Sequence, residues 1–178
     1  MALKPQDVYV TLKIVASKMR RAPYSQLAVE LVMSPSEVHA SVRRAQASHL
    51  LHGPQLHNRP NLAALEEFLV HGIKYVFPAE RGEMTRGVPT SWAAEPLLGV
   101  IAQGNEPAPV WPYQEGKHRG IAFEPLHKTA PIAALRDPSF YEYLVLADAL
   151  RDGRVRERKL AEEALHRRLR EANEQLES

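Results

Sequence analysis

The chain contains no cysteine among its 178 residues. This absence excludes disulfide bonds, thiol nucleophiles and cysteine-ligated zinc, and it is typical of a reducing compartment. The sequence also has no apolar run approaching the ~20 residues that cross a bilayer, and no apolar segment of a signal peptide follows Met1. We therefore expect a cytoplasmic protein without a membrane segment.

Patterns that carry catalysis or bind cofactors are also missing. There is no Ser-His-Asp order, nucleophile elbow, carboxylate pair in a recognisable setting, P-loop or dinucleotide-binding motif. Three of the eight histidines, His49, His52 and His57, lie close in sequence, but no acidic residue lies between Glu37 and Glu66 to complete a metal site. We expect no enzyme, no cofactor and no bound metal.

Charge is present in ordinary amount but is unevenly distributed. The whole chain carries a net charge of +2, with 44% hydrophobic and 25% charged residues, which is typical of a soluble globular protein. Residues 1–60 hold eight Lys or Arg against three Asp or Glu. Residues 61–135 hold six against eight, and residues 136–178 hold nine against ten. This asymmetry favours a first segment that meets a polyanion such as DNA.

Residues 24–47 have the pattern of two short helices joined by a tight turn. In the first helix, Ser25 is the expected cap and apolar residues recur from Leu27 to Leu31. Ser34 is followed by Pro35 at the first helical position and by Glu37, which together form a capping box and a helix start. An earlier helix is predicted over residues 5–21 from the spacing of Val8, Leu12, Val15 and Met19.

The second of these helices has distinct inner and outer faces. Val38, Val42 and Ala45 recur at helical spacing and should face a core. The outer face then carries Ser36, His39, Ala40, Arg43 and Arg44. This arrangement predicts a helix-turn-helix whose second helix enters the DNA major groove. The alternative is an ordinary helical hairpin with a solvated outer face.

The segment after this helix predicts a wing. Leu50 and Leu51 are followed by a turn at Gly53-Pro54 and by a return strand from Leu56, within residues 51–59. His52, Gln55, His57, Asn58 and Arg59 in this segment are able to reach phosphates or the minor groove.

With these elements, residues 6–60 resemble the winged helix-turn-helix of bacterial regulators of the MarR-like class. The elements that carry the resemblance are the helix from Val8, the helix from Tyr24, the segment SPSEVHASVRRA and the Gly53-Pro54 wing. The resemblance implies that residues 36–44 contact bases and that the wing clamps the DNA backbone. The longer mixed segment after the wing departs from the long dimerisation helices of those proteins.

The remaining two thirds predict a mixed segment. Residues 61–72 should form a helix that ends at Gly72, and Ile73–Phe77 a strand. Residues 79–98 should form a loop with one helical turn in 89–94. Val110-Trp111 and residues 121–123 should pair as an antiparallel hairpin, and Pro131–Leu135 should form a turn. Helices should follow from Asp137-Pro138 to Asp152-Gly153 and from Arg154 to about Glu174. The last helix has an apolar seam that should pack on the body, or else on a second copy or another partner.

Functional candidates in this segment are few. The loop ERGEMTRG, residues 80–87, is a candidate ligand or partner contact through Arg81 and Arg86. Trp92 and Trp111 are expected in the core, and small-molecule sensing would need a cavity lined by one of them or by Arg86. Residues 61–150 are weakly similar to MarR-like regulators, through the segment from Phe68 to Leu97 and the later segments EPL and AALRDPSFYEYL. Some of these regulators are encoded beside nucleotidyltransferase-type proteins in toxin–antitoxin-like pairs, which implies an antitoxin or adaptor that holds a protein partner.

We therefore predict an α+β fold, with a winged helix-turn-helix domain in residues 1–60 and a mixed α/β regulatory or partner-binding domain in residues 61–178 that ends in helices. The predicted function is sequence-specific transcription regulation as a homodimer on double-stranded DNA, as a repressor or autoregulator. The alternative is an antitoxin-like or adaptor protein that binds a partner such as a nucleotidyltransferase through residues 61–178. The predicted DNA contacts are Tyr24, Ser25, Gln26, Ser34, Ser36, His39, Ala40, Arg43, Arg44, His52, Gln55, His57 and Arg59.

Overall fold

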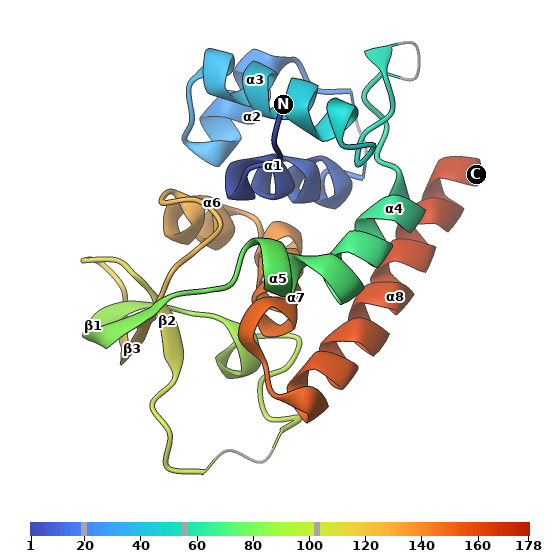
Figure 1. Cartoon of the computed structure of the whole chain (residues 1–178). Coiled ribbons are helices and arrows are strands. Elements are labelled where there is room, and N and C mark those ends of the chain that lie inside the picture. Colours follow the sequence, from blue (N-terminus) through green and yellow to red (C-terminus); the bar gives the residue numbers. More distant parts are fainter. Residues whose placement is uncertain (19–20, 55–56, 102–103) are drawn as a thin grey trace.

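The structure is a computed structural model that describes residues 1–18, 21–54, 57–101 and 104–178. It confirms the α+β class, because most of the chain is helical and three short strands form one small sheet (Figure 1). No helix in the described part combines the length and the apolar character that a membrane crossing requires. The elements are α1 (Pro5–Ala16), α2 (Tyr24–Leu31), α3 (Pro35–Ala47), α4 (Leu62–Glu67), the π-helical turn η2 (Phe68–Gly72), α5 (Ile73–Val76), β1 (Arg81–Pro89), the 3-10 turn η3 (Ser91–Ala93), β2 (Pro109–Pro112), β3 (His118–Phe123), α6 (Ala130–Arg136), α7 (Pro138–Asp152) and α8 (Val155–Glu177).

Three helices form the N-terminal part, as the sequence predicts. α1 ends at Ala16 rather than at Arg21, because Lys18 adopts a left-handed conformation (φ 53°) that no α-helix continues. Met19 of the predicted stripe lies outside the described residues. In the described part of residues 51–60, the β-pairing consists of a single bridge between Leu51 and Pro60. The two strands expected for a wing therefore do not form there.

After this bridge, residues 62–76 form one continuous helical segment. The predicted strand Ile73–Phe77 is wrong, and Gly72 does not end the helix, because α4, η2 and α5 follow one another without a break. The reason is the core face: Leu65, Leu69 and Ile73 recur every four residues and are all buried. This stripe overrides the local preference of Ile73 and its neighbours for a strand.

The strands also differ from the expectation. Residues 81–89, predicted as part of a loop, form the longest strand, β1. β2 and β3 each pair antiparallel with β1, but they pair with each other in parallel, so the predicted antiparallel hairpin is wrong. The three strands thereby close into a small barrel. The predicted helical turn in residues 89–94 is confirmed by η3.

This barrel is so narrow that two positions require glycine. A Cβ atom on Gly87 would lie 1.9 Å from the carbonyl oxygen of Trp111. A Cβ atom on Gly120 would lie 2.0 Å from that of Ala108. The strands approach each other closely because these residues have no side chain, and the backbone positions in the barrel are correspondingly rigid.

The C-terminal helices largely follow the sequence. α7 begins at Pro138 with Asp137 as its cap, whose carboxylate accepts a hydrogen bond from the Phe140 N–H at 3.1 Å. Residues 130–136 form the helix α6, where a single turn is predicted. α8 extends to Glu177, and Leu165 and Leu169 of its seam are buried inside the molecule, as the leading expectation states.

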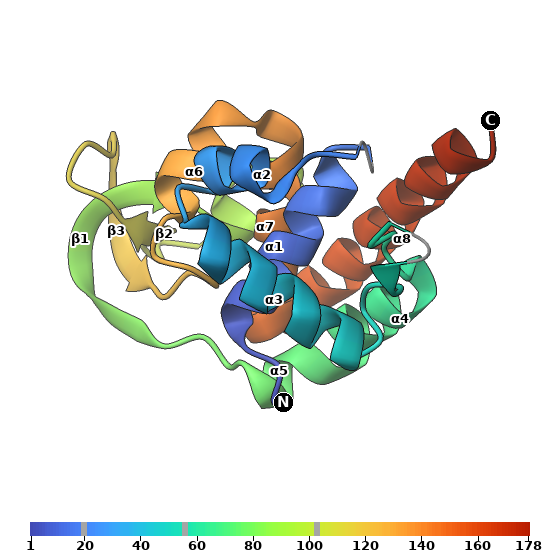
Figure 2. The ribbon, with the colours of Figure 1, turned by 90° about the horizontal axis from the view of Figure 1, so that it is seen from above.

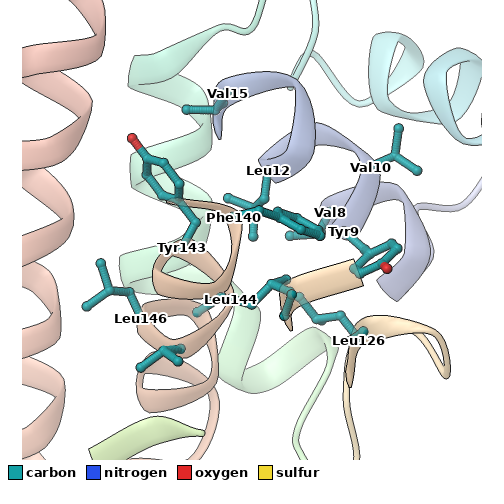
Figure 3. Packing of buried hydrophobic residues seen from close by; sticks show 14 of the residues in the cluster. Val8, Tyr9, Val10, Leu12, Val15, Leu126, Phe140, Tyr143, Leu144 and Leu146 are labelled. Atoms are coloured by element: carbon teal, nitrogen blue, oxygen red, sulfur yellow. The ribbon is translucent and has the colours of Figure 1, made fainter. Parts of the chain in front are cut away.

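α7 lies at the centre of the molecule, and most other elements pack around it (Figure 1). Its residues 143–151 are buried on every side. α1 packs across its start: Figure 3 shows Val8 and Leu12 beside Phe140. The predicted boundary at residues 60 and 61 remains a prediction, but one continuous hydrophobic cluster joins the two segments in the structure.

One buried ion pair connects α7 to the barrel. The Asp148 carboxylate accepts hydrogen bonds from the Thr90 hydroxyl at 2.6 Å, the Trp111 indole at 2.8 Å and the Arg151 guanidinium at 2.8 Å. Arg151 also donates to the backbone carbonyls of Phe77 and Glu124, both at 2.9 Å. Burial raises the pKa of Asp148. The positive charge of Arg151 and the hydrogen bonds from Thr90, Trp111 and Arg151 oppose this effect because they stabilise the carboxylate.

Replacement of this carboxylate should destabilise the protein strongly. Asp148→Asn keeps the shape but leaves the Arg151 charge buried without a counter-ion, so the free energy of unfolding should fall by about 3 kcal/mol or more in urea denaturation. Asp152→Asn is the matched control, because its partner Arg81 is half exposed and the loss should stay below about 1 kcal/mol. Equal losses in the two variants would contradict a special role for Asp148.

Candidate nucleic-acid interface

The start of α3 is built as the sequence predicts. The Ser34 hydroxyl accepts from the Glu37 N–H at 3.2 Å, and the Glu37 carboxylate accepts from the Ser34 N–H at 2.8 Å. These hydrogen bonds lower the pKa of Glu37 because they favour its charged form. The capping box therefore sets where α3 begins and which side chains face outward.

α3 presents the predicted outer face at the surface, in the foreground of Figure 2. Ser34, Ser36, His39 and Arg43 are exposed and Ala40 is half-buried. Val38, Val42 and Ala45 are completely buried, which confirms the predicted inner face.

Arg44 differs from the other predicted contacts of α3, because it is occupied inside the protein. Its guanidinium binds both carboxylate oxygens of Asp7, with distances of 2.7 to 3.1 Å, and donates to the Ser41 hydroxyl at 3.3 Å. Asp7 is fully buried in the first turn of α1. Arg44 therefore fastens α3 to α1 and is not available as a free cation.

A cleft of about 1010 Å³ lies between α3 and the loop of residues 51–60. Among the described residues that line it are three arginines and two histidines but no Asp or Glu. Arg21, Arg43 and Arg59 form no ion pair within the described ranges. The full lining is Ile14, Ser17, Arg21, Ala22, Pro23, Tyr24, Leu27, His39, Arg43, Gln46, Pro54, His57, Asn58, Arg59, Pro60 and Leu176.

Amide side chains hold the loop against the helices. The Gln46 amide nitrogen donates to the Asn58 side-chain oxygen and to the His52 carbonyl oxygen. The Asn58 amide donates to the Tyr24 hydroxyl at 3.0 Å, and the Tyr24 ring meets the His39 ring edge to face at 5.4 Å. His57 and Asn58 both have positive φ, so the loop turns sharply at this point and presents its side chains beside α3.

The structure brings five predicted contacts together in the cleft: Tyr24, His39, Arg43, His57 and Arg59. Ser25 is exposed on α2, which begins at Tyr24 with Pro23 in the cap position, so the predicted Ser25 cap is wrong. Gln26 is exposed and donates to Glu30 at 3.1 Å. His52 lines a smaller neighbouring cleft of about 260 Å³, and Gln55 lies outside the described residues.

The four candidates in residues 61–178 do not form one site. Arg81 pairs with Asp152 at 2.5 Å, and Arg86 is exposed on β1. Trp92 and Trp111 are buried, as expected. Neither of the two clefts is lined by Trp92, Trp111 or Arg86, so these clefts give no support to small-molecule sensing at those residues. The described residues include no group of three or more His, Asp or Glu placed to hold a metal ion.

A hydrogen-bonded cluster fixes the end of α2 to the start of α6. The Thr129 hydroxyl and the Tyr9 hydroxyl lie 2.8 and 3.3 Å from the carbonyl oxygen of Leu31, and 3.0 Å from each other. His127 Nδ1 lies 2.7 Å from the Thr129 hydroxyl, and its ring stacks on Tyr9 at 5.2 Å. Lys13 adds an ion pair from α1 to Asp137 at 2.6 Å. The turn before α3 therefore has a fixed position relative to residues 127–137.

Sequence reasoning missed Arg21 and Gln46 in the cleft. Gln46 follows His39 and Arg43 at seven and three residues, so the helical spacing itself could have placed it on the same face. Arg21 is expected at the end of the first helix, but α1 ends at Ala16 and Arg21 lies outside it. The His127 cluster joins residues about a hundred positions apart, and no local pattern indicates it.

Comparison with protein-family models, with curated proteins and with solved structures finds no match to this chain. The likeness to MarR-like regulators therefore remains a prediction.

Loss of the Arg44 side chain should destabilise the fold. Arg44→Gln leaves the buried Asp7 carboxylate without its counter-ion, so we expect a loss of about 3 kcal/mol in the free energy of unfolding, measured with urea. The neighbouring exposed residue provides the control, since Arg43→Gln should change stability by less than about 0.5 kcal/mol. A harmless Arg44→Gln would show that the Asp7 pair does not hold α3 in place.

The His127 cluster should make stability depend on pH. Burial lowers the pKa of His127, with Glu37 opposing and Lys128 reinforcing this effect. As the pH falls, His127 in the unfolded chain takes up a proton at about pH 6.5, whereas in the folded protein it does so only at a lower pH. The free energy of unfolding should therefore decrease as the pH falls from about 6.5 to the folded pKa of His127, and should be constant above about pH 6.5.

The measurement is the melting temperature between pH 5 and pH 8. His127→Gln should reduce the loss on the acid side, whereas His71→Gln, which replaces an exposed histidine, should leave it unchanged. An identical acid-side loss in the wild type and in His127→Gln would assign the pH dependence to other groups.

Proposed function

We propose that this protein is a sequence-specific transcription regulator that binds double-stranded DNA. In this proposal α2 and α3 act as a helix-turn-helix and residues 51–60 act as its wing. The observation that carries the proposal is the cleft between α3 and this loop, where Arg21, Arg43 and Arg59 meet without a carboxylate in the lining.

The face of α3 supports base contacts. Ser36, His39 and Arg43 are exposed residues of α3, which lies at the periphery of the molecule (Figure 2). B-DNA admits an α-helix in its major groove, and an arginine there can donate two hydrogen bonds to a guanine. The half-buried Ala40 leaves room for close approach of the helix at its middle.

The cleft supports phosphate contacts. Of the eight cations in residues 1–60, Lys13 and Arg44 are held by internal carboxylates, which reduces the charge available to a ligand. Arg21 and Arg59 line the same cleft as Arg43, and neither forms an ion pair in the described part of the chain. In this proposal α3 contacts one groove of the DNA and the loop reaches the next groove. The DNA backbone between these two grooves lies along the cleft.

We further propose that two copies bind together on a pseudo-palindromic site, since a single helix-turn-helix reads only a short half-site. The adaptor or antitoxin alternative depends on the weak likeness of residues 61–150, and no contact in the described residues favours it. It becomes the preferred function if DNA binding fails.

DNA binding by purified full-length protein tests the proposal. Fluorescence anisotropy with a duplex from its own promoter region and with an unrelated duplex, each over a salt series, should give tighter binding to the promoter and a steep negative salt slope. Arg43→Ala should weaken promoter binding by about 1–3 kcal/mol and reduce the discrimination between duplexes, if Arg43 contacts a guanine. Arg59→Gln should weaken both duplexes alike and make the slope shallower by about one unit.

Arg156→Gln is the control for charge. Arg156 is exposed near the start of α8, at the opposite end of the molecule from α3 (Figure 1), so its replacement should leave both affinities unchanged. Equal, weak binding of the two duplexes, or equal losses in Arg43→Ala and Arg156→Gln, would reject the proposed interface and leave the partner-binding alternative.

A further inference from the structure

The barrel places two arginines directly opposite each other. In the antiparallel ladder of β1 and β3, Arg86 is the register partner of Arg119. Directly opposed residues share one face of a sheet, with Cβ atoms about 4.5–5.5 Å apart. Both side chains are exposed, and Lys117 and His118 beside them are exposed as well.

This pair has no counter-ion of its own. Like charges directly opposite destabilise a sheet, yet no carboxylate in the described residues lies within ion-pair distance of Arg86 or Arg119. The contrast is Arg81 on the same strand, which pairs with Asp152. Of the acidic residues near the pair in sequence, Glu115 accepts a hydrogen bond from the Tyr113 hydroxyl, and Glu83 forms no ion pair in the described part.

The backbone beneath the pair is closely packed against its neighbours. Gly120 follows Arg119 and Gly87 follows Arg86, and both are the positions where a Cβ atom would collide with a neighbouring strand. The Tyr113 N–H also donates to the Arg86 carbonyl oxygen at 3.0 Å, which fixes the turn of residues 113–117 to β1. The two arginines therefore project from directly opposed positions of a closely packed pair of strands.

We propose that Arg86 and Arg119 together bind a phosphate group. A phosphate placed between them would neutralise the adverse pair and would accept two hydrogen bonds from each planar guanidinium. The group can belong to a small phosphorylated ligand or to a polynucleotide backbone. This site is separate from the DNA interface proposed above, because Figures 1 and 2 both place the strands on the side of the molecule away from residues 51–60.

The first test is an NMR titration of the ¹⁵N-labelled full chain with inorganic phosphate, with chloride adjusted to keep the ionic strength constant. We expect saturable shifts of the amides in residues 85–87 and 117–120. Arg86→Gln and Arg119→Gln should each weaken this binding by about tenfold or more, since each removes a charged donor pair. Arg156→Gln removes the same charge elsewhere and should not alter it.

Two further measurements distinguish phosphate recognition from nonspecific charge attraction and from misfolding. Arg119→Lys keeps the charge but loses the forked donor, so it should also weaken phosphate binding. Without phosphate, Arg119→Gln should melt at the wild-type temperature or above it, because the opposed charges are relieved. A lower melting temperature together with lost spectral dispersion would assign the weakened binding to unfolding and would count against the proposal.

The source of the phosphate is distinguished by a second titration. Shifts with inorganic phosphate or pyrophosphate would support a small ligand, and shifts at the same residues only with a short oligonucleotide would support a polynucleotide. The proposal is overturned if polyglutamate shifts these residues equally well, or if inorganic phosphate, pyrophosphate and the oligonucleotide all fail to shift them. The double variant Arg86→Gln/Arg119→Gln should retain promoter binding. A failure of the phosphate proposal can therefore be distinguished from a failure of the proposed DNA interface.

Discussion

The buried ion pair of Asp148 and Arg151 is the contact on which the arrangement of the other elements depends. Residues 143–151 of α7 are buried, and this pair places two opposite charges within that stretch. Asp148 binds Thr90 and Trp111 at the barrel, while Arg151 binds the carbonyl oxygens that follow α5 and β3. Buried charges are tolerated only when their hydrogen bonds are satisfied. The position of the barrel against α7 is therefore determined by these contacts.

The N-terminal helices are joined to the same centre by different means. Val8 and Leu12 of α1 pack on Phe140, and Lys13 reaches the residue that caps α7 (Figure 3). Arg44 in turn holds α3 against α1 through the buried Asp7. The helix that we propose to enter DNA is thus connected through α1 to α7 and the barrel. A change in the barrel or in α6 has a physical route to α3 through these contacts.

Cations of the same type have different roles according to what lies beside them. Arg44 and Arg151 pair with the buried carboxylates of Asp7 and Asp148, and the buried Lys13 pairs with Asp137, so these three cations stabilise the fold. Arg21, Arg43 and Arg59 surround a cleft without acidic lining, and Arg86 and Arg119 face each other on the barrel. Only cations of the second kind are free to bind an anionic partner. The net charge of a segment therefore overstates how many of its cations a polyanion can meet.

The sequence by itself determined the features that depend on neighbouring residues. The capping box of Ser34 and Glu37, the inner face of α3, the start of α7 at Asp137 and the extent of α8 all follow from contacts within one or two helical turns. Tertiary structure alone decided the helical state of residues 73–76, the strand β1, the pairing of β2 with β3 and the ion pair of Arg44 with Asp7. These depend on partners distant in the chain: the core that receives Ile73, the strands that pair with β1, and Asp7. Such partners are identified only when the chain has folded, because spacing along the sequence does not show which surfaces meet.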